Sequence, residues 1–136
     1  MPHFHLSLQS GNDLILKRMK RRHSRKQAID FCNKIKKIRD DVVLGADLIA
    51  GFPTETEIMF NDSLSLIDEC NLTHLHIFPY SQRDLTPATK MPQVSKEIIK
   101  VRAKKLREKG KEKFNNYLSS LIGKECKVLI EKSETI

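Results

Sequence analysis

Apolar positions along the chain change their spacing several times, and each spacing predicts a different kind of element. In residues 4–9, leucines alternate with polar side chains, which is typical of a strand with one buried face. Residues 42–50 are apolar almost without interruption, as in a parallel strand that is covered on both faces. A third short run, residues 73–78, ends at a proline and predicts another strand.

Helical spacing of apolar residues, together with capping motifs, predicts four helices between and after these strands. We expect them at residues 13–22, 25–39, 55–70 and 96–122. Each follows a residue whose side chain can cap the first turn, namely Asn12, Ser24, Thr54 and Ser95. A last apolar run, residues 126–130, predicts a strand with no later segment to pair with.

This alternation of strands and helices predicts an α/β fold with a parallel sheet. A closed (β/α) barrel needs about eight strand–helix units, and the chain supplies three of them. We therefore expect a partial (β/α) barrel, with a small doubly wound sheet as the alternative. The opening strand has no turn before it and the last strand has no partner, which favours a slice of a larger protein.

Composition narrows the range of partners. Hydrophobic residues make up 39% of the chain, which allows a packed core. No apolar run approaches the ~20 residues that a membrane span requires, and the first residues lack the features of a signal peptide. We therefore expect a soluble, cytoplasmic protein. The net charge of +8 favours polyanions such as nucleic acids, although a well-solvated basic surface would give the same composition.

Cysteines and histidines are the candidate metal ligands, and neither set predicts a site. Cys32, Cys70 and Cys126 lie far apart, and none belongs to a short Cys-x-x-Cys pair. We expect them to be small apolar residues of a reduced compartment. His74 and His76 alternate along one strand as metal ligands could. Because no third ligand is near them in sequence, we interpret them as core histidines.

Functional residues of parallel α/β folds gather at the C-terminal ends of the strands. Here each predicted strand end carries polar residues together with glycine or proline. The three segments are HLSLQSG (residues 5–11), DLIAGFPTET (47–56) and FPYSQRDLTPA (78–88). Each segment alone is a weak signal, and their joint order is much more specific.

Together with LKRMKR at residues 16–21, these segments resemble the second half of the barrel in the radical S-adenosylmethionine tRNA methylthiotransferases. The resemblance covers nearly the whole chain. The first and third segments are most similar to the subgroup that acts on threonylcarbamoyladenosine next to the tRNA anticodon. The resemblance implies barrel strands and loops in residues 1–94 and a long basic helix in 95–122. Residues 123–136 would then begin a small β-barrel RNA-binding domain.

The resemblance also implies a chemistry and its cofactors. The family inserts a methylthio group at an unreactive C–H carbon of an adenosine. A [4Fe-4S] cluster reduces S-adenosylmethionine to a radical, and a second cluster handles sulfur. The implied partners are S-adenosylmethionine and the anticodon arm of tRNA. The family's cluster cysteines lie upstream of the matching segments and are absent here, so we expect the chain alone to be inactive and an upstream half to carry the clusters.

Site residues follow from the same resemblance. The candidate cofactor contacts are residues at or near the three strand ends, namely Ser7, Gln9, Ser10, Asp47, Ile49, Gly51, Phe52, Phe78, Pro79 and Tyr80. The candidate substrate contacts are basic residues that could meet phosphate or carboxylate groups, namely Arg83, Lys17, Arg18, Arg21 and Arg22. For each of them the alternative is a structural role, such as a strand face, a turn, a helix cap or a solvated charge.

Two other functions remain open. A sister radical enzyme could act on isopentenyladenosine or on a ribosomal protein. A non-catalytic basic RNA-binding module would explain the charge, but it would leave the three strand-end motifs without a reason.

Overall fold

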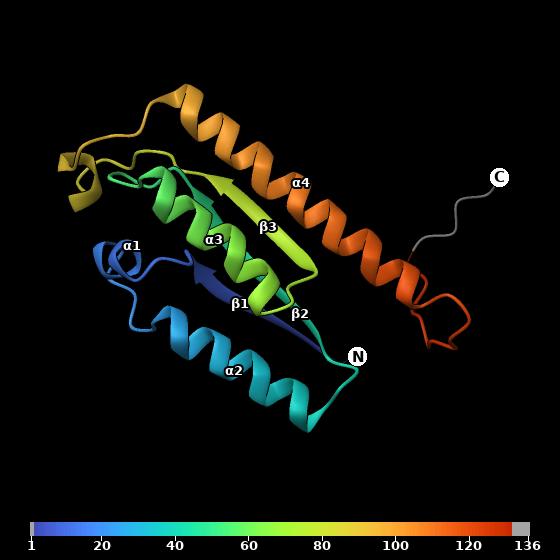
Figure 1. The fold of residues 1–136 in the computed structure, drawn as a ribbon. Coiled ribbons are helices and arrows are strands. Elements are labelled where there is room, and N and C mark those ends of the chain that lie inside the picture. Colours follow the sequence, from blue (N-terminus) through green and yellow to red (C-terminus); the bar gives the residue numbers. More distant parts are fainter. Residues whose placement is uncertain (1, 132–136) are drawn as a thin grey trace.

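A computed structural model describes residues 2–131 of the chain (Figure 1). Strands and helices alternate along the chain as the apolar spacing predicts. In order, the elements are β1 (His3–Gln9), α1 (Asp13–Arg18), α2 (Arg25–Ile38), β2 (Val43–Ala50), α3 (Glu57–Glu69), β3 (His74–Pro79), the 3-10 helix η1 (Pro87–Lys90) and α4 (Lys96–Ser120).

The three strands form one parallel sheet in the order β1-β2-β3, with β2 in the centre. This arrangement confirms the predicted α/β fold with an open parallel sheet. The register places His5 opposite Gly45 and Asp47 opposite His76. Because the strands are parallel, their C-terminal ends meet at one edge, where α1 and the segment around η1 also lie (Figure 1).

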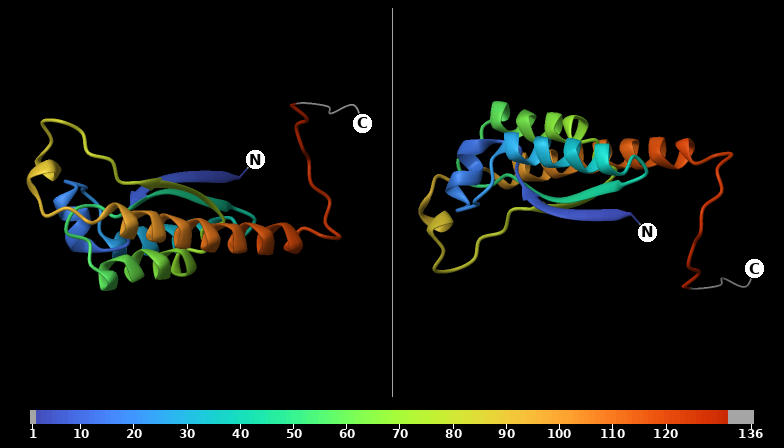
Figure 2. Two further views of the ribbon diagram at one scale, coloured as in Figure 1. Left: turned by 90° about the horizontal axis from the view of Figure 1, so that it is seen from above. Right: turned by 90° about the horizontal axis from the view of Figure 1, so that it is seen from below.

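Helices α2, α3 and α4 all lie against the same face of the sheet (Figure 2). The side chains of β2 that point toward them are fully buried, namely Leu44, Ala46, Leu48 and Ala50. Asp47 and Ile49 point to the other face and stay partly exposed. The prediction that β2 is covered on both faces is therefore wrong for residues 2–131, because no helix in this part of the chain covers the second face.

Two helix ends differ from the sequence prediction. Thr56, not Thr54, caps α3, since its hydroxyl accepts a hydrogen bond from the Met59 amide. Thr54 has a φ of 75° and its amide donates to the carbonyl of Pro92, so it belongs to a turn before the helix. The helix α1 ends at Arg18 rather than near residue 22, because Lys20 has a φ of 58° and turns the chain.

The expected last strand is also wrong. Residues 126–130 form no strand and are exposed to solvent. A strand needs a neighbour to satisfy its backbone hydrogen bonds, and this segment has none within residues 2–131. By contrast, the predicted cap at Ser24 is confirmed, and it forms a capping box with Gln27. Gly123, with a φ of 82°, follows the end of α4.

Candidate functional site

A cavity of about 660 Å³ opens where the C-terminal ends of the three strands meet. All three strand ends contribute to its walls, and the end of α1 and the segment before and within η1 complete them. The lining residues are Gln9, Arg18, Met19, Lys20, Arg21, Ile49, Phe52, Phe78, Pro79, Tyr80, Ser81, Arg83, Thr86, Pro87 and Ala88. A cavity of this size, with apolar walls and a few polar groups, is typical of a small-molecule site.

The end of β1 brings Gln9 into this cavity by a local distortion of the strand. Gln9 has a φ of 68°, and the pairing register between β1 and β2 shifts between Leu6 and Gln9. The next residue, Ser10, is buried; its hydroxyl lies near that of Ser63 and accepts a hydrogen bond from the Asn12 amide. Ser10 therefore does not line the cavity, although the sequence suggested that it would.

Residues at the end of β2 face two ways, some toward the cavity and one toward the helix layer. Ile49 and Phe52 line the cavity, whereas Gly51 points toward α4. Gly51 has a φ of 76°, and an added Cβ would collide with the side chain of Ile99 on α4. Gly51 therefore allows the close approach of a helix, and this predicted cofactor contact is not part of the cavity wall.

The Gly51 turn is held by Glu55, whose carboxylate accepts the Gly51 amide proton at 3.1 Å. The same carboxylate oxygen lies 3.0 Å from the Arg102 guanidinium, which also donates to the Glu55 carbonyl at 2.8 Å. Burial raises the pKa of Glu55, while the Gly51 amide and Arg102 oppose that shift. The sequence does not reveal this pair, because Glu55 and Arg102 lie 47 residues apart.

The end of β3 supplies most of the aromatic wall. Phe78, Pro79 and Tyr80 all line the cavity, and the Tyr80 amide donates to the Ala50 carbonyl of β2 at 2.8 Å. The Tyr80 ring meets Phe52 edge to face, with 5.5 Å between ring centroids. The Tyr80 hydroxyl is buried and has no hydrogen-bond partner among the residues that the structure describes. It is therefore available to a polar group of a bound molecule.

The predicted basic residues divide into two sets. Arg18, Arg21 and Arg83 line the cavity. Arg18 donates to the Thr54 hydroxyl at 2.6 Å and Arg21 to the Ser7 carbonyl at 2.6 Å, so these two residues tie the end of α1 to the strand ends. Lys17 and Arg22 are exposed and lie outside the cavity lining.

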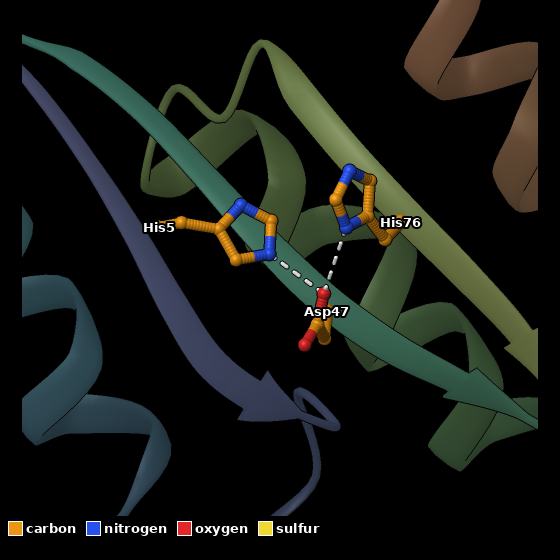
Figure 3. A group of neighbouring side chains, drawn as sticks. All are labelled: His5, Asp47 and His76. Carbon is orange, nitrogen blue, oxygen red and sulfur yellow. Dashed lines mark hydrogen bonds and ion pairs between the residues drawn. The ribbon is translucent and has the colours of Figure 1, made fainter.

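Ser7 and Asp47 lie on the open face of the sheet, on the same side as Gln9 and Ile49 but before the cavity along the strands. Asp47 is flanked by two histidines (Figure 3). His5 Nε2 lies 2.6 Å and His76 Nδ1 3.3 Å from the same carboxylate oxygen.

The interpretation of His74 and His76 as core histidines is wrong. His76 is exposed and His74 is only partly buried, because both belong to the open face. Two further candidate ligands lie near His76 in space, namely Asp47 of β2 and His5 of β1, whereas His74 is not part of this group. Strand register creates this group, and sequence spacing alone does not reveal it.

The cavity fits S-adenosylmethionine in the chemistry of its walls. Ile49, Phe52 and Phe78 offer apolar surface to an adenine ring, while the amide of Gln9 and the unpartnered Tyr80 hydroxyl offer hydrogen bonds. Its volume also lies within the range usual for such ligands.

An iron–sulfur cluster does not fit the described cysteines. Such a cluster is held by several thiolates that converge on its iron atoms, and the described cysteines do not converge on one place. Cys32 and Cys70 are buried in the hydrophobic core, and their mutual hydrogen bond lowers the pKa of Cys32 and raises that of Cys70. Cys126 is exposed on the segment after α4. No set of thiolates suited to a cluster is therefore present in residues 2–131.

Comparison with known proteins agrees with this geometry. The family described as the radical SAM superfamily matches residues 1–67. Among solved structures, coproporphyrinogen III oxidase from Escherichia coli, described as a radical SAM enzyme, is similar with a TM-score of 0.60 and 18% identity. The similarity covers 90% of this chain and 26% of that chain. The matched segment indicates the radical SAM class, and the solved structure shows a similar fold.

Curated relatives of the chain include tRNA-modifying enzymes that are named for methylthio groups. Threonylcarbamoyladenosine tRNA methylthiotransferase of Rickettsia prowazekii is 54% identical over 98% of this chain and 32% of its own length. A tRNA-2-methylthio-N(6)-dimethylallyladenosine synthase of Staphylococcus haemolyticus is 41% identical over 98% of this chain and 26% of its own length. The chain belongs to the radical SAM tRNA methylthiotransferase family, and it spans between about a quarter and a third of the length of these relatives.

No helix formed by residues 2–131 combines the length and the apolar character that a membrane crossing demands.

Proposed function

We propose that this chain forms the part of a tRNA methylthiotransferase that holds S-adenosylmethionine and faces the tRNA. The observation that carries the proposal is the meeting of all three strand ends, through Gln9, Ile49 and Phe78, in one cavity. The cofactor, when bound, supplies the radical that activates a C–H bond. The residues of this chain supply binding, orientation and exclusion of water.

Each wall of the cavity has a distinct part in this proposal. Ile49, Phe52 and Phe78 enclose the adenine and keep water from it. Gln9 and Tyr80 orient the ribose or the methionine end through hydrogen bonds. Arg18 and Arg21 keep the rim closed on the β1 side, because each is hydrogen-bonded to a strand end.

Exposed basic residues next to the rim are suited to tRNA phosphates. Arg83 lines the rim itself, and Lys17 and Arg22 are exposed on the neighbouring segment. Arg22, Lys20 and Arg21 also border a shallow depression beside the cavity. We propose that this surface contacts the anticodon arm and that Arg83 reaches the modified adenosine.

The cluster ligands must come from other sequence in this proposal, since the described cysteines do not suit a cluster. We propose that residues upstream of the matched segments carry them, either in the same polypeptide or in a second one. The domain division at residues 94 and 122 is proposed on the same basis, with the last segment leading toward an RNA-binding domain.

The substrate is proposed to be threonylcarbamoyladenosine, because the relative with that named substrate is 54% identical to this chain. Dimethylallyladenosine is the second candidate, since several relatives are named for it, one of them 41% identical. Both are modified adenosines, so the cavity is compatible with either substrate.

Mass spectrometry of tRNA nucleosides from a strain lacking the gene tests the proposal. We expect the methylthio form of threonylcarbamoyladenosine to disappear, while the form without the methylthio group accumulates. Loss of the methylthio form of dimethylallyladenosine instead would transfer the assignment to the second candidate. An unchanged set of both methylthio nucleosides would contradict the proposed function.

Point variants of the gene, returned to the deletion strain, test whether the loss of the methylthio nucleoside depends on the cavity. Phe78→Ala removes a cavity wall and is expected to leave little of the methylthio nucleoside. Phe31→Ala removes an exposed aromatic side chain of α2, outside the cavity, and is expected to restore it fully. Equal restoration by the two variants would argue against the cavity as the cofactor site.

A further inference from the structure

Three side chains from three different strands converge on the open face of the sheet (Figure 3). They are His5 of β1, Asp47 of β2 and His76 of β3, and their ligand atoms all lie within 4.8 Å of one another. Asp47 stands in the middle strand, directly opposite His76 in the register. The parallel sheet therefore holds the three donors on a rigid frame.

Gly45 makes room for this convergence. It lies directly opposite His5 in the register, two residues before Asp47 on the same face of β2. An added Cβ at Gly45 would lie 2.9 Å from the His5 ring and 2.6 Å from the His74 carbonyl. The missing side chain thus lets the His5 ring lie across β2 and reach Asp47.

We propose that His5, Asp47 and His76 form a binding site for a divalent transition-metal ion. Two imidazole nitrogens and one carboxylate oxygen are a donor set that such ions accept readily. The spacings of 2.6 and 3.3 Å from the Asp47 oxygen to the two nitrogens suit three ligands around one ion after small adjustments.

The surroundings leave further coordination positions accessible. The side chain of His76 is 65% exposed, and those of His5 and Asp47 are 33% and 25% exposed. No helix formed by residues 2–131 covers this face (Figure 2). An ion there would lie about 7 Å before the cavity floor, since Asp47 precedes Ile49 by two strand residues.

Cobalt(II) binding to the tag-free full chain tests this site, because cobalt(II) reports its ligands by visible absorption. The chain should carry Cys126→Ser, which removes an exposed thiol that could bind the metal. We expect one saturable ion per chain and no thiolate-to-cobalt charge-transfer band. Absence of saturable binding up to ~1 mM, a weak affinity on the usual scale, would overturn the proposal.

Ligand variants locate the ion. His5→Gln, Asp47→Asn and His76→Gln should each weaken binding by at least about tenfold. His74→Gln, a histidine of the same strand and face outside the group, should leave the affinity unchanged. Unchanged binding in all three ligand variants would overturn the proposal even if cobalt binds elsewhere.

Amide spectra guard against effects of misfolding, because those of the helix layer should stay the same in all three ligand variants. The proposal is independent of the proposed function, because cobalt binding does not require the cofactor, the tRNA or an iron–sulfur cluster.

Discussion

The guanidinium of Arg102 on α4 and the carboxylate of Glu55 before α3 lie 3.0 Å apart, with side chains only 7% and 1% exposed. Glu55 in turn accepts the amide proton of Gly51 at the end of β2. The pair therefore connects the longest helix to the central strand directly behind the cavity. The shape of the cavity wall at Phe52 depends on this buried contact, because Phe52 follows Gly51.

Removal of Arg102 should destabilise the fold strongly. Arg102→Met leaves the Glu55 carboxylate buried without its partner, which typically costs about 3–5 kcal/mol. Arg107→Met removes an exposed charge from the same helix and should change stability by less than about 0.5 kcal/mol. Urea unfolding of the two variants measures the difference, and equal midpoints would contradict the structural role of the pair.

Two glycines with similar backbone angles should respond differently to alanine. Gly51 and Gly123 have φ values of 76° and 82°. Only Gly51 faces a neighbour, since an added Cβ would collide with Ile99, while nothing lies within 4 Å at Gly123. Both substitutions carry the backbone cost of about 1 kcal/mol, and Gly51→Ala should cost clearly more. Thermal unfolding measures the loss of stability in each variant. An equal loss in both would contradict the packing of α4 on this turn.

Stability should decline as the pH falls below neutrality, partly through His23. Burial lowers the pKa of His23 from its ordinary value of 6.5, and Arg21 adds to the shift. A lowered pKa means that the unfolded chain binds the proton more readily. The stability that the neutral ring contributes is therefore present above pH 6.5 and is lost as the pH falls through the folded pKa.

Urea unfolding at a series of pH values tests this contribution. His23→Gln should show a shallower loss of unfolding free energy between about pH 7.5 and pH 5 than the unsubstituted chain. Identical pH profiles would show that His23 is not the titrating group.

Binding of tRNA should weaken steeply with salt if basic residues near the rim contact phosphates. Each lost phosphate contact lowers the slope of log affinity against log salt by about one. Arg22→Ala should therefore flatten the slope, whereas Lys34→Ala, an exposed residue of α2 that lines neither the cavity nor the depression beside it, should not. Equal slopes in the two variants would place the tRNA elsewhere on the chain.

The strand and helix pattern was largely accessible from sequence because apolar spacing follows the geometry of each element. The cap at Ser24 and the three strand ends are examples. The strand predicted at residues 126–130 does not form. A strand needs a partner for its backbone hydrogen bonds, and this segment has none in the part of the chain described here.

Part of the candidate site could also be predicted from the sequence. Residues at strand ends could be grouped, and Gln9, Ile49 and Tyr80 do line one cavity. Ser10 and Gly51 turn away, because local turns and a helix contact decide their direction. The group around Asp47 depends on the register between strands, which the order of residues within each strand does not determine.

Nuclear magnetic resonance titration of the labelled chain with S-adenosylmethionine tests the central claim most directly. The account predicts saturable shifts concentrated at Gln9, Ile49, Phe52 and Tyr80, and their loss in the Phe78→Ala variant. Shifts confined to the opposite ends of the strands, or no saturable shifts at all, would contradict a cofactor cavity built by the three strand ends.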